Sequence, residues 1–354
     1  MARIVVIRLS ALGDVAISVP LVHALAEQYP EHVFVMVSQP RMSGLFTDCP
    51  SNVQFVSAGI YGKHKGVIGL YRLFKELNPK NVDVVCDMHN VIRTRILGFF
   101  FKLMRIPVFR IDKQRSERLK LTRIKNKEFR QLKTSFQNYR DVFAKAGLSL
   151  NYFDAWPKLE VNRTNLPEME ILFGEKNTNW LGFAPFAKHA GKIYPLQLTE
   201  QVLAHFAMDS NYTVFLLGGG KEEMEQLRKW KEQFPSVQIP TGMFLKDEVR
   251  LMSCMDLIFA MDSANMHLGS LARTPVVSVW GSTHPYTGFY GLYQDVRNII
   301  QDDISCRPCS VFGNKPCYRK DYACLNRIKP EQIIAKIEQI LTQKMVSKMA
   351  EVQL

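Results

Sequence analysis

The feature of this sequence that most constrains its fold is a regular alternation between short β-branched segments and segments with helical apolar spacing. In the first half, the strand-like segments lie at residues 3–8, 33–37, 53–56, 82–86 and 107–111. Helical patterns separate them near residues 15–28, 67–77, 92–103 and 136–146. Strands and helices that alternate at these lengths indicate a parallel sheet with helices on both faces. The predicted fold class is therefore α/β.

The second half of the chain restarts the pattern after a segment rich in Pro, Asn and Asp at residues 149–167, which we interpret as a linker. The later strand-like segments lie at residues 179–185, 212–217, 256–260 and 275–280. A chain of 354 residues is long enough for two domains. We predict two Rossmann-like domains, residues 1–165 and 166–330, with parallel sheets that face each other across a ligand cleft. Residues 331–354 are expected to form a C-terminal helix that packs back on the first domain.

Positive charge is concentrated in one part of the chain. The sequence has 46 Lys and Arg against 33 Asp and Glu, a net charge of +13, and residues 91–133 alone contribute +11. This basic window is either a solvated surface or a contact for an anionic partner, such as a phosphorylated glycolipid at a bilayer. No apolar segment reaches the roughly 20 residues of a membrane-spanning helix, and the N-terminus lacks a signal-peptide core. We therefore expect a cytoplasmic protein that binds membranes peripherally.

The first candidate site follows the first strand, at Ser10, Gly13 and Asp14. The single glycine does not form a dinucleotide fingerprint, which disfavours a nicotinamide oxidoreductase. Asp14 has two interpretations. It is an acid in the first turn of a helix, favoured by the helix dipole, or it is a general base at a strand end.

The second half has a similar set of polar and small residues after its strands. Lys192 precedes a proline-opened helix and is either a solvated loop lysine or a phosphate ligand. Asp262 and Ser263 can cap the helix that follows them, but the same helix start can bind an anion, with His267 one turn further along. The chain has no Asp-x-Asp motif, so we expect no metal ion in catalysis.

Four cysteines lie close together near the C-terminus, in the spacing Cys-x2-Cys-x7-Cys-x6-Cys. They are Cys306, Cys309, Cys317 and Cys324. Four thiolates can bind zinc tetrahedrally, but this spacing is looser than that of a zinc ribbon. Reduced thiols packed in a loop remain the alternative.

Several motifs resemble those of one enzyme family. They are Ile-Arg-Leu-Ser-Ala-Leu-Gly-Asp at Ile7–Asp14, Lys-x-aromatic-Pro at Lys192–Pro195, Leu-Leu-Gly-Gly at Leu216–Gly219, Asp-Ser-x-x-x-His at Asp262–His267 and Thr-Pro-Val-Val at Thr274–Val277. With these motifs in this order along the sequence, the chain resembles the bacterial ADP-heptose:lipopolysaccharide heptosyltransferases of glycosyltransferase family nine. The resemblance implies a GT-B fold and an inverting transfer of heptose from ADP-heptose to a lipopolysaccharide inner-core acceptor of the lipid A-Kdo type. It also implies that the enzyme acts on the cytoplasmic face of the inner membrane.

The resemblance implies catalytic roles for Asp14, as the base, and for Lys192, as the phosphate lysine. The expected donor-binding residues follow strands of the second domain and are Lys188, Lys192, Gly218, Gly219, Thr241, Asp262, Ser263, Ala264 and His267. The expected acceptor-binding residues belong to the first turn and to the basic window, and are Ser10, Gly13, Arg93, Arg115, Arg118, Lys120 and Arg123.

Three departures from the family pattern concern the identity of the sugar. Ala264 stands where Gly is usual, Phe186 where a small residue is common, and Tyr194 where Trp is common. One alternative is therefore a transferase of the same fold that uses another nucleotide sugar for a different surface glycan. A non-catalytic polyanion-binding protein is the alternative from a different class. We expect no cofactor beyond the nucleotide-sugar donor and no nucleic-acid partner.

Overall fold

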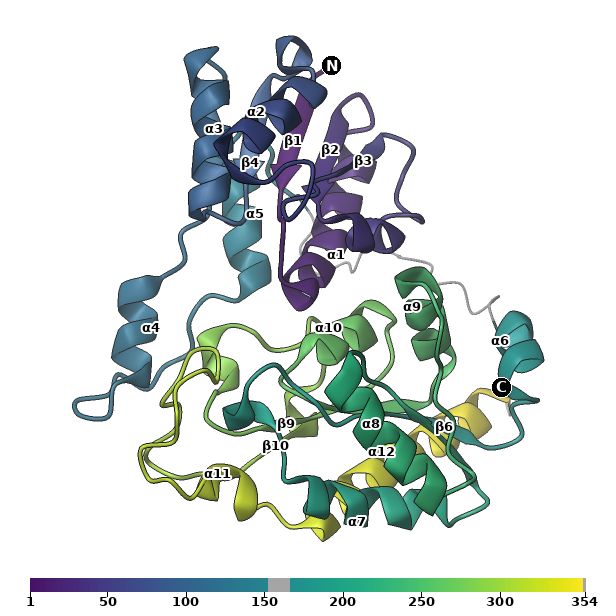
Figure 1. Ribbon diagram of the computed structural model, residues 1–354. Helices are drawn as coiled ribbons and strands as arrows, with labels where there is room; N and C mark the ends of the chain where they lie inside the picture. Colours follow the sequence, from purple (N-terminus) through teal and green to yellow (C-terminus); the bar gives the residue numbers. More distant parts are fainter. Residues whose placement is uncertain (152–165, 353–354) are drawn as a thin grey trace. The chain divides into compact units, whose positions relative to one another are not determined.

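The computed structural model describes residues 1–151 and 166–352, and contains two parallel five-stranded sheets (Figure 1). Each sheet belongs to its own compact unit. Unit 1 includes Met1–Gln114, residues 133–151 and Phe244–Lys246, and unit 2 includes the other described residues. The α/β prediction is confirmed. The predicted domain boundary at residue 165 lies outside the described residues.

Unit 1 has the strand order β3-β2-β1-β4-β5. Its strands are β1 (Arg3–Ile7), β2 (Val33–Ser38), β3 (Val53–Ser57), β4 (Val84–Asp87) and β5 (Val108–Arg110). Its helices are α1 (Leu12–Gln28), α2 (Gly66–Glu76), α3 (Ile92–Leu103) and α5 (Ser135–Lys145), with short 3-10 turns at Pro40–Leu45 and Pro79–Asn81. Ile7 pairs in register with Val37 and with Asp87, so β1, β2 and β4 end at one edge of the sheet.

Unit 2 has the strand order β10-β9-β8-β6-β7. Its strands are β6 (Asn179–Ala184), β7 (Tyr212–Leu216), β8 (Leu257–Met261), β9 (Val276–Trp280) and β10 (Ile299–Gln301). Its helices are α4 (Arg115–Thr122), α6 (Leu166–Phe173), α7 (Leu196–Ala207), α8 (Lys221–Gln233), α9 (Leu245–Cys254), α10 (Ala264–Leu271), α11 (Ala323–Asn326) and α12 (Pro330–Val352). Short 3-10 turns lie at Ala190–Lys192, Pro285–Thr287 and Val296–Asn298.

The C-terminal helix α12 packs within unit 2. Its apolar side chains Ile333, Ile337 and Leu341 are buried in the core of this unit. Lys344 Nζ lies 2.8 Å from Oδ1 of the buried Asp256, at the start of β8. The apolar side chains of α12 therefore pack in the core of unit 2, and not on the first domain as we expected.

The segment Arg115–Leu132 also belongs to unit 2, although the sequence placed it in the first domain. Lys127 Nζ donates hydrogen bonds to four successive carbonyl oxygens, those of residues 305–308, at 3.2, 2.8, 2.7 and 3.1 Å. The ring of Phe129 packs edge-on against His284, and Leu132 N–H donates to the carbonyl of Tyr286. These contacts join residues more than 150 positions apart, so local patterns could not reveal them. We call Arg115–Leu132 the docked segment.

Helices α2 and α3 of unit 1 lie side by side and leave apolar side chains exposed (Figure 1). The exposed apolar side chains of this face are Val67, Ile68, Tyr71, Ile92, Phe99, Leu103 and Met104. Phe101 of α3 is fully buried, since it packs against Phe74 in the core. No helix in the described part of the chain is long and apolar enough to cross a bilayer.

Candidate functional site

The polar residues of unit 1 gather at the edge where β1 and β4 end. The turn after β1 contains Ser10, and α1 begins at Leu12, so Gly13 and Asp14 lie in the first turn of this helix. Asp14 Oδ2 accepts a hydrogen bond from Ala11 N–H at 3.3 Å. Asp14 is therefore an acid in the first turn of α1, which is the first of its two interpretations.

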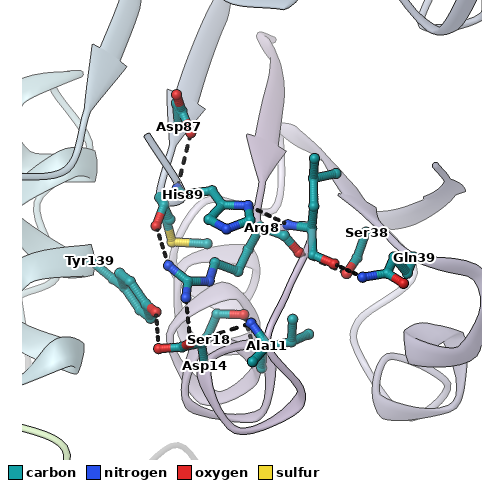
Figure 2. Close-up of polar contacts among 12 residues, drawn as sticks. Arg8, Ala11, Asp14, Ser18, Ser38, Gln39, Asp87, His89 and Tyr139 are labelled. Carbon is teal, nitrogen blue, oxygen red and sulfur yellow. Dashed lines mark hydrogen bonds and ion pairs between the residues drawn. The ribbon is translucent and has the colours of Figure 1, made fainter. Parts of the chain in front are cut away.

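The same carboxylate makes a second contact, an ion pair with Arg8 (Figure 2). Arg8 Nη2 lies 2.5 Å from Asp14 Oδ2, and Arg8 Nη1 donates to the carbonyl of Met88 at 2.8 Å. Tyr139 Oη donates to Asp14 Oδ1 at 3.4 Å. Burial is the largest single influence and lowers the pKa of Arg8, but the charge and hydrogen bond of Asp14, together with Tyr139 and Asp87, raise this pKa above its usual value. Asp14 is thus held in one orientation by a charged side chain.

His89 lies two residues after the end of the neighbouring strand β4. Asp87 Oδ1 accepts hydrogen bonds from the backbone N–H groups of His89 and Asn90, at 2.9 and 2.8 Å. Leu9 N–H donates to Nδ1 of His89 at 3.3 Å (Figure 2). Burial, followed by the charges of Arg8 and other cations, lowers the pKa of His89 to about 3. The imidazole is therefore neutral.

Sequence reasoning missed Arg8, Tyr139 and His89. Arg8 carried a signal, because a charged residue at the end of an otherwise apolar strand needs a partner when it is buried. Tyr139 lies 125 residues from Asp14 in the sequence, so no local pattern indicated their contact. His89 was overlooked because it follows a strand that has no recognised motif.

In unit 2, the structure brings Lys192 and Asp262 together. Lys192 lies in the 3-10 turn that follows β6, and Asp262 comes directly after β8. Lys192 Nζ is 2.9 Å from Asp262 Oδ2, and Thr283 Oγ1 donates to the same oxygen at 2.7 Å. A Cβ at Gly313 would lie 2.4 Å from Lys192 Cγ, so this glycine leaves the space that the lysine side chain occupies.

Asp262 and Ser263 do not cap α10 through their side chains. Ser263 is the N-cap residue, but it makes no side-chain capping hydrogen bond, and its buried Oγ has no hydrogen-bond partner in the described structure. Asp262 is engaged by Lys192 and Thr283 instead. The first-turn N–H groups of a helix without a side-chain cap are suited to binding an anion. Ala264 begins this helix, and His267 is buried one turn further along.

The other predicted donor residues lie on exposed turns of unit 2. Gly218 and Gly219 are exposed directly after β7, and Gly219 N–H donates to Glu223 Oε2 at 2.8 Å. Lys188 is exposed after β6, and Thr241 is exposed in the loop before α9. Whether these four residues contact a donor stays a prediction.

The predicted basic acceptor residues are divided between the two units. Arg93 is exposed at the start of α3 in unit 1, over the ring of Tyr61. The other basic residues of that set belong to the docked segment of unit 2 and are Arg115, Arg118, Lys120 and Arg123. In that segment Lys120 and Arg123 pair with Glu128, at 3.7 and 3.3 Å. Part of the basic window is thus neutralised locally.

The four late cysteines are all free. Among the described residues, no three His, Cys, Asp or Glu side chains come together as a group that could hold a metal ion. Burial raises the pKa of Cys309, and raises that of Cys324 to about 12, which favours the protonated thiol. The described residues thus give no support to a structural zinc site, and reduced thiols packed in a loop remain the alternative.

Comparison with known proteins places these features in a family context. The model of glycosyltransferase family 9 (heptosyltransferase) matches residues 70–318. The chain is 25% identical to a lipopolysaccharide core heptosyltransferase of Haemophilus influenzae over 342 residues, covering 94% of this chain and 92% of that protein.

Two solved structures are similar over nearly the whole chain. A glycosyl transferase family 9 protein from Veillonella parvula has a TM-score of 0.73 at 20% identity, and the match covers 97% of this chain and 98% of that chain. The E. coli ADP-heptose lipopolysaccharide heptosyltransferase II has a TM-score of 0.70 at 18% identity, with 97% and 99% covered. These similarities confirm the predicted GT-B fold class.

Proposed function

The chain belongs to glycosyltransferase family 9, the heptosyltransferase family, and is therefore a glycosyltransferase; we propose that it transfers heptose from ADP-heptose to a lipopolysaccharide inner-core acceptor. The observation that carries the proposal is the carboxylate of Asp14, oriented by Arg8 at the carboxyl edge of the sheet in unit 1. The donor and acceptor named in similar proteins support the substrates. A non-catalytic polyanion-binding role is disfavoured by membership of this family.

The donor diphosphate binds at the carboxyl ends of β6 and β8. Lys192 supplies a positive charge there, and the amino end of α10 supplies backbone N–H groups beside the unpartnered Ser263 Oγ. In the structure Lys192 pairs with Asp262. Donor binding therefore brings a second anion to Lys192, while Thr283 continues to hold Asp262 in place.

The reaction is a single displacement. Asp14 accepts the proton of the acceptor hydroxyl while the hydroxyl oxygen forms a bond to the anomeric carbon of the donor sugar. The bond between that carbon and the diphosphate oxygen breaks on the opposite face, so the configuration inverts. The nucleoside diphosphate leaves with the electron pair, and Lys192 and the amino end of α10 stabilise its charge without a metal ion.

The acceptor is a membrane lipid, and we propose that the exposed face of α2 and α3 rests on the cytoplasmic side of the inner membrane. This face combines exposed apolar side chains, among them Ile68, Phe99 and Leu103, with the exposed cations Arg95 and Lys102. A basic residue near an anionic leaflet contributes about 1 kcal/mol of binding free energy. Peripheral binding of this kind needs no membrane-spanning helix.

The test is a transfer assay of the purified protein with ADP-, UDP- and GDP-sugars and lipid A-Kdo acceptors. We expect turnover with ADP-heptose and an inverted configuration in the product. Turnover with a different nucleotide sugar alone would overturn the assignment of heptose but not of sugar transfer, and Ala264 at the start of α10 is the residue to examine in that case. Donor binding without transfer to any acceptor would overturn the proposed acceptor.

A further inference from the structure

The backbone around His89 is fixed from two sides. Asp87 Oδ1 binds the N–H groups of His89 and Asn90, and Met88 N–H donates to the carbonyl of Ile7 at 3.1 Å. The Met88 carbonyl receives Arg8 Nη1. His89 is therefore built into the same network that orients Asp14, as Figure 2 shows.

The hydrogen bond from Leu9 determines which ring nitrogen of His89 carries the proton. A backbone N–H only donates, so Nδ1 of His89 must offer a lone pair to Leu9 N–H. In a neutral imidazole the proton then lies on Nε2. Among the side chains that the structure describes, Nε2 has no hydrogen-bond partner, and His89 is only half-buried. An oriented N–H donor is thus left available at the end of β4.

The charges around His89 keep this donor neutral. Burial is the largest cause of its low pKa, and the positive charges of Arg8, Lys113 and Arg93 lower it further, while Asp14 has the opposite effect. Arg8 directly follows β1, Lys113 lies in the loop after β5, Arg93 belongs to α3 and Asp14 to α1. A neutral donor does not compete with Arg8 for the carboxylate of Asp14, as a cationic imidazole would.

We propose that His89 is an acceptor-binding residue whose Nε2–H donates to an oxygen of the acceptor sugar next to the attacking hydroxyl. The inference rests on the proposed function, because it assigns the acceptor to the edge of the sheet where Asp14 lies. Asp14 accepts the proton of the hydroxyl, and His89 holds the neighbouring oxygen so that the hydroxyl points toward Asp14. His89 itself neither gains nor loses a proton in the reaction.

The experiment compares His89→Leu and His89→Gln with the wild-type protein, using His32→Leu as the matched control. His32 is a histidine of the same unit, but it precedes β2 and so lies at the amino end of the sheet. We expect His89→Leu to raise the acceptor KM about tenfold, as the loss of one hydrogen bond predicts, with the donor KM unchanged. His89→Gln should recover most of the loss, because its side-chain amide also donates.

A pH series separates a neutral donor from a charged one. The acceptor KM of the wild-type protein should show no change assigned to His89 between about pH 5 and 8, because the unperturbed histidine pKa is about 6.5 and that of His89 is about 3. A break near pH 6.5 that disappears in His89→Gln would overturn the neutral donor.

A wild-type acceptor KM in His89→Leu would overturn the role itself, as would an equal rise in the donor KM. Unchanged donor KM and thermal midpoint show that a variant is folded. A wild-type protein that transfers no sugar would refute the proposed function instead, so the two failures are distinguishable.

Discussion

Arg8 is the more buried partner of its ion pair with Asp14, with 9% of its side chain exposed against 23% for the aspartate. The pair is 2.5 Å long and joins the end of β1 to the first turn of α1. Because the aspartate keeps its contact with solvent, its carboxylate can be oriented by Arg8 and still be reached by a substrate hydroxyl.

Asp14→Asn should abolish most of the transfer. The amide keeps the shape of the side chain but cannot accept the proton, so we expect kcat to fall by about 10²- to 10⁴-fold. Donor binding, measured by titration with ADP, should stay near the wild-type value. Turnover close to that of the wild type would remove Asp14 from the role of base.

Removal of Asp14 and removal of Arg8 should lower the free energy of unfolding by different amounts. Asp14→Ala leaves the buried Arg8 guanidinium without its carboxylate, which costs about 3 kcal/mol of the free energy of unfolding. Arg8→Met leaves a carboxylate that reaches solvent, so we expect a smaller loss. Urea unfolding of both variants and of the double variant measures the difference. A larger loss in Arg8→Met would contradict the asymmetry of burial.

Lys192→Ala should weaken the binding of ADP, because it removes the positive charge at the end of β6. We expect a Kd at least about tenfold higher, which corresponds to about 1.4 kcal/mol. Lys229→Ala, which removes an exposed lysine of α8, is the matched control. Calorimetric titration checks both variants, and equal affinities would remove Lys192 from the donor site.

Chelation of divalent ions should leave transfer largely intact. In the proposed mechanism, Lys192 and the amino end of α10 supply the charge that the leaving diphosphate needs. The measurement is kcat with ADP-heptose before and after dialysis against EDTA. Loss of activity that is restored by added Mg²⁺ or Mn²⁺ would contradict a metal-independent mechanism.

Two variants test the proposed contact of α2 and α3 with a membrane. Phe99→Ser combined with Leu103→Ser should reduce flotation with anionic liposomes, because it removes exposed apolar area from the face of α2 and α3. Leu119→Ser is the matched control, since it changes an exposed leucine of α4 in the docked segment. Equal binding by the wild type and the double variant would argue against this face.

The order of helices and strands could be predicted because apolar periodicity is a local property. Helix α3 begins and ends at the predicted residues, Ile92–Leu103. Helix α4 was missed because its sequence is mostly polar and it forms in a segment whose long-range contacts include the four carbonyls around Lys127. The three-residue edge strand β10 is too short to show a pattern.

Part of the candidate site followed from the sequence for the same reason. Asp14 and Asp262 lie close behind strands of parallel sheets, where such folds place their polar residues. Their chain positions were therefore enough to single them out. Lys192 was identified because it follows another strand of the same sheet as β8.

Only the tertiary structure decided which partner each of these charges has. The contacts of Asp14 with Tyr139, and of Leu9 with His89, join residues that are 125 and 80 positions apart. The docked segment, which contains much of the basic window, likewise belongs to unit 2 and not to the first domain as predicted. Local sequence determines where a helix or strand forms, whereas packing of distant segments determines which buried charge meets which neighbour.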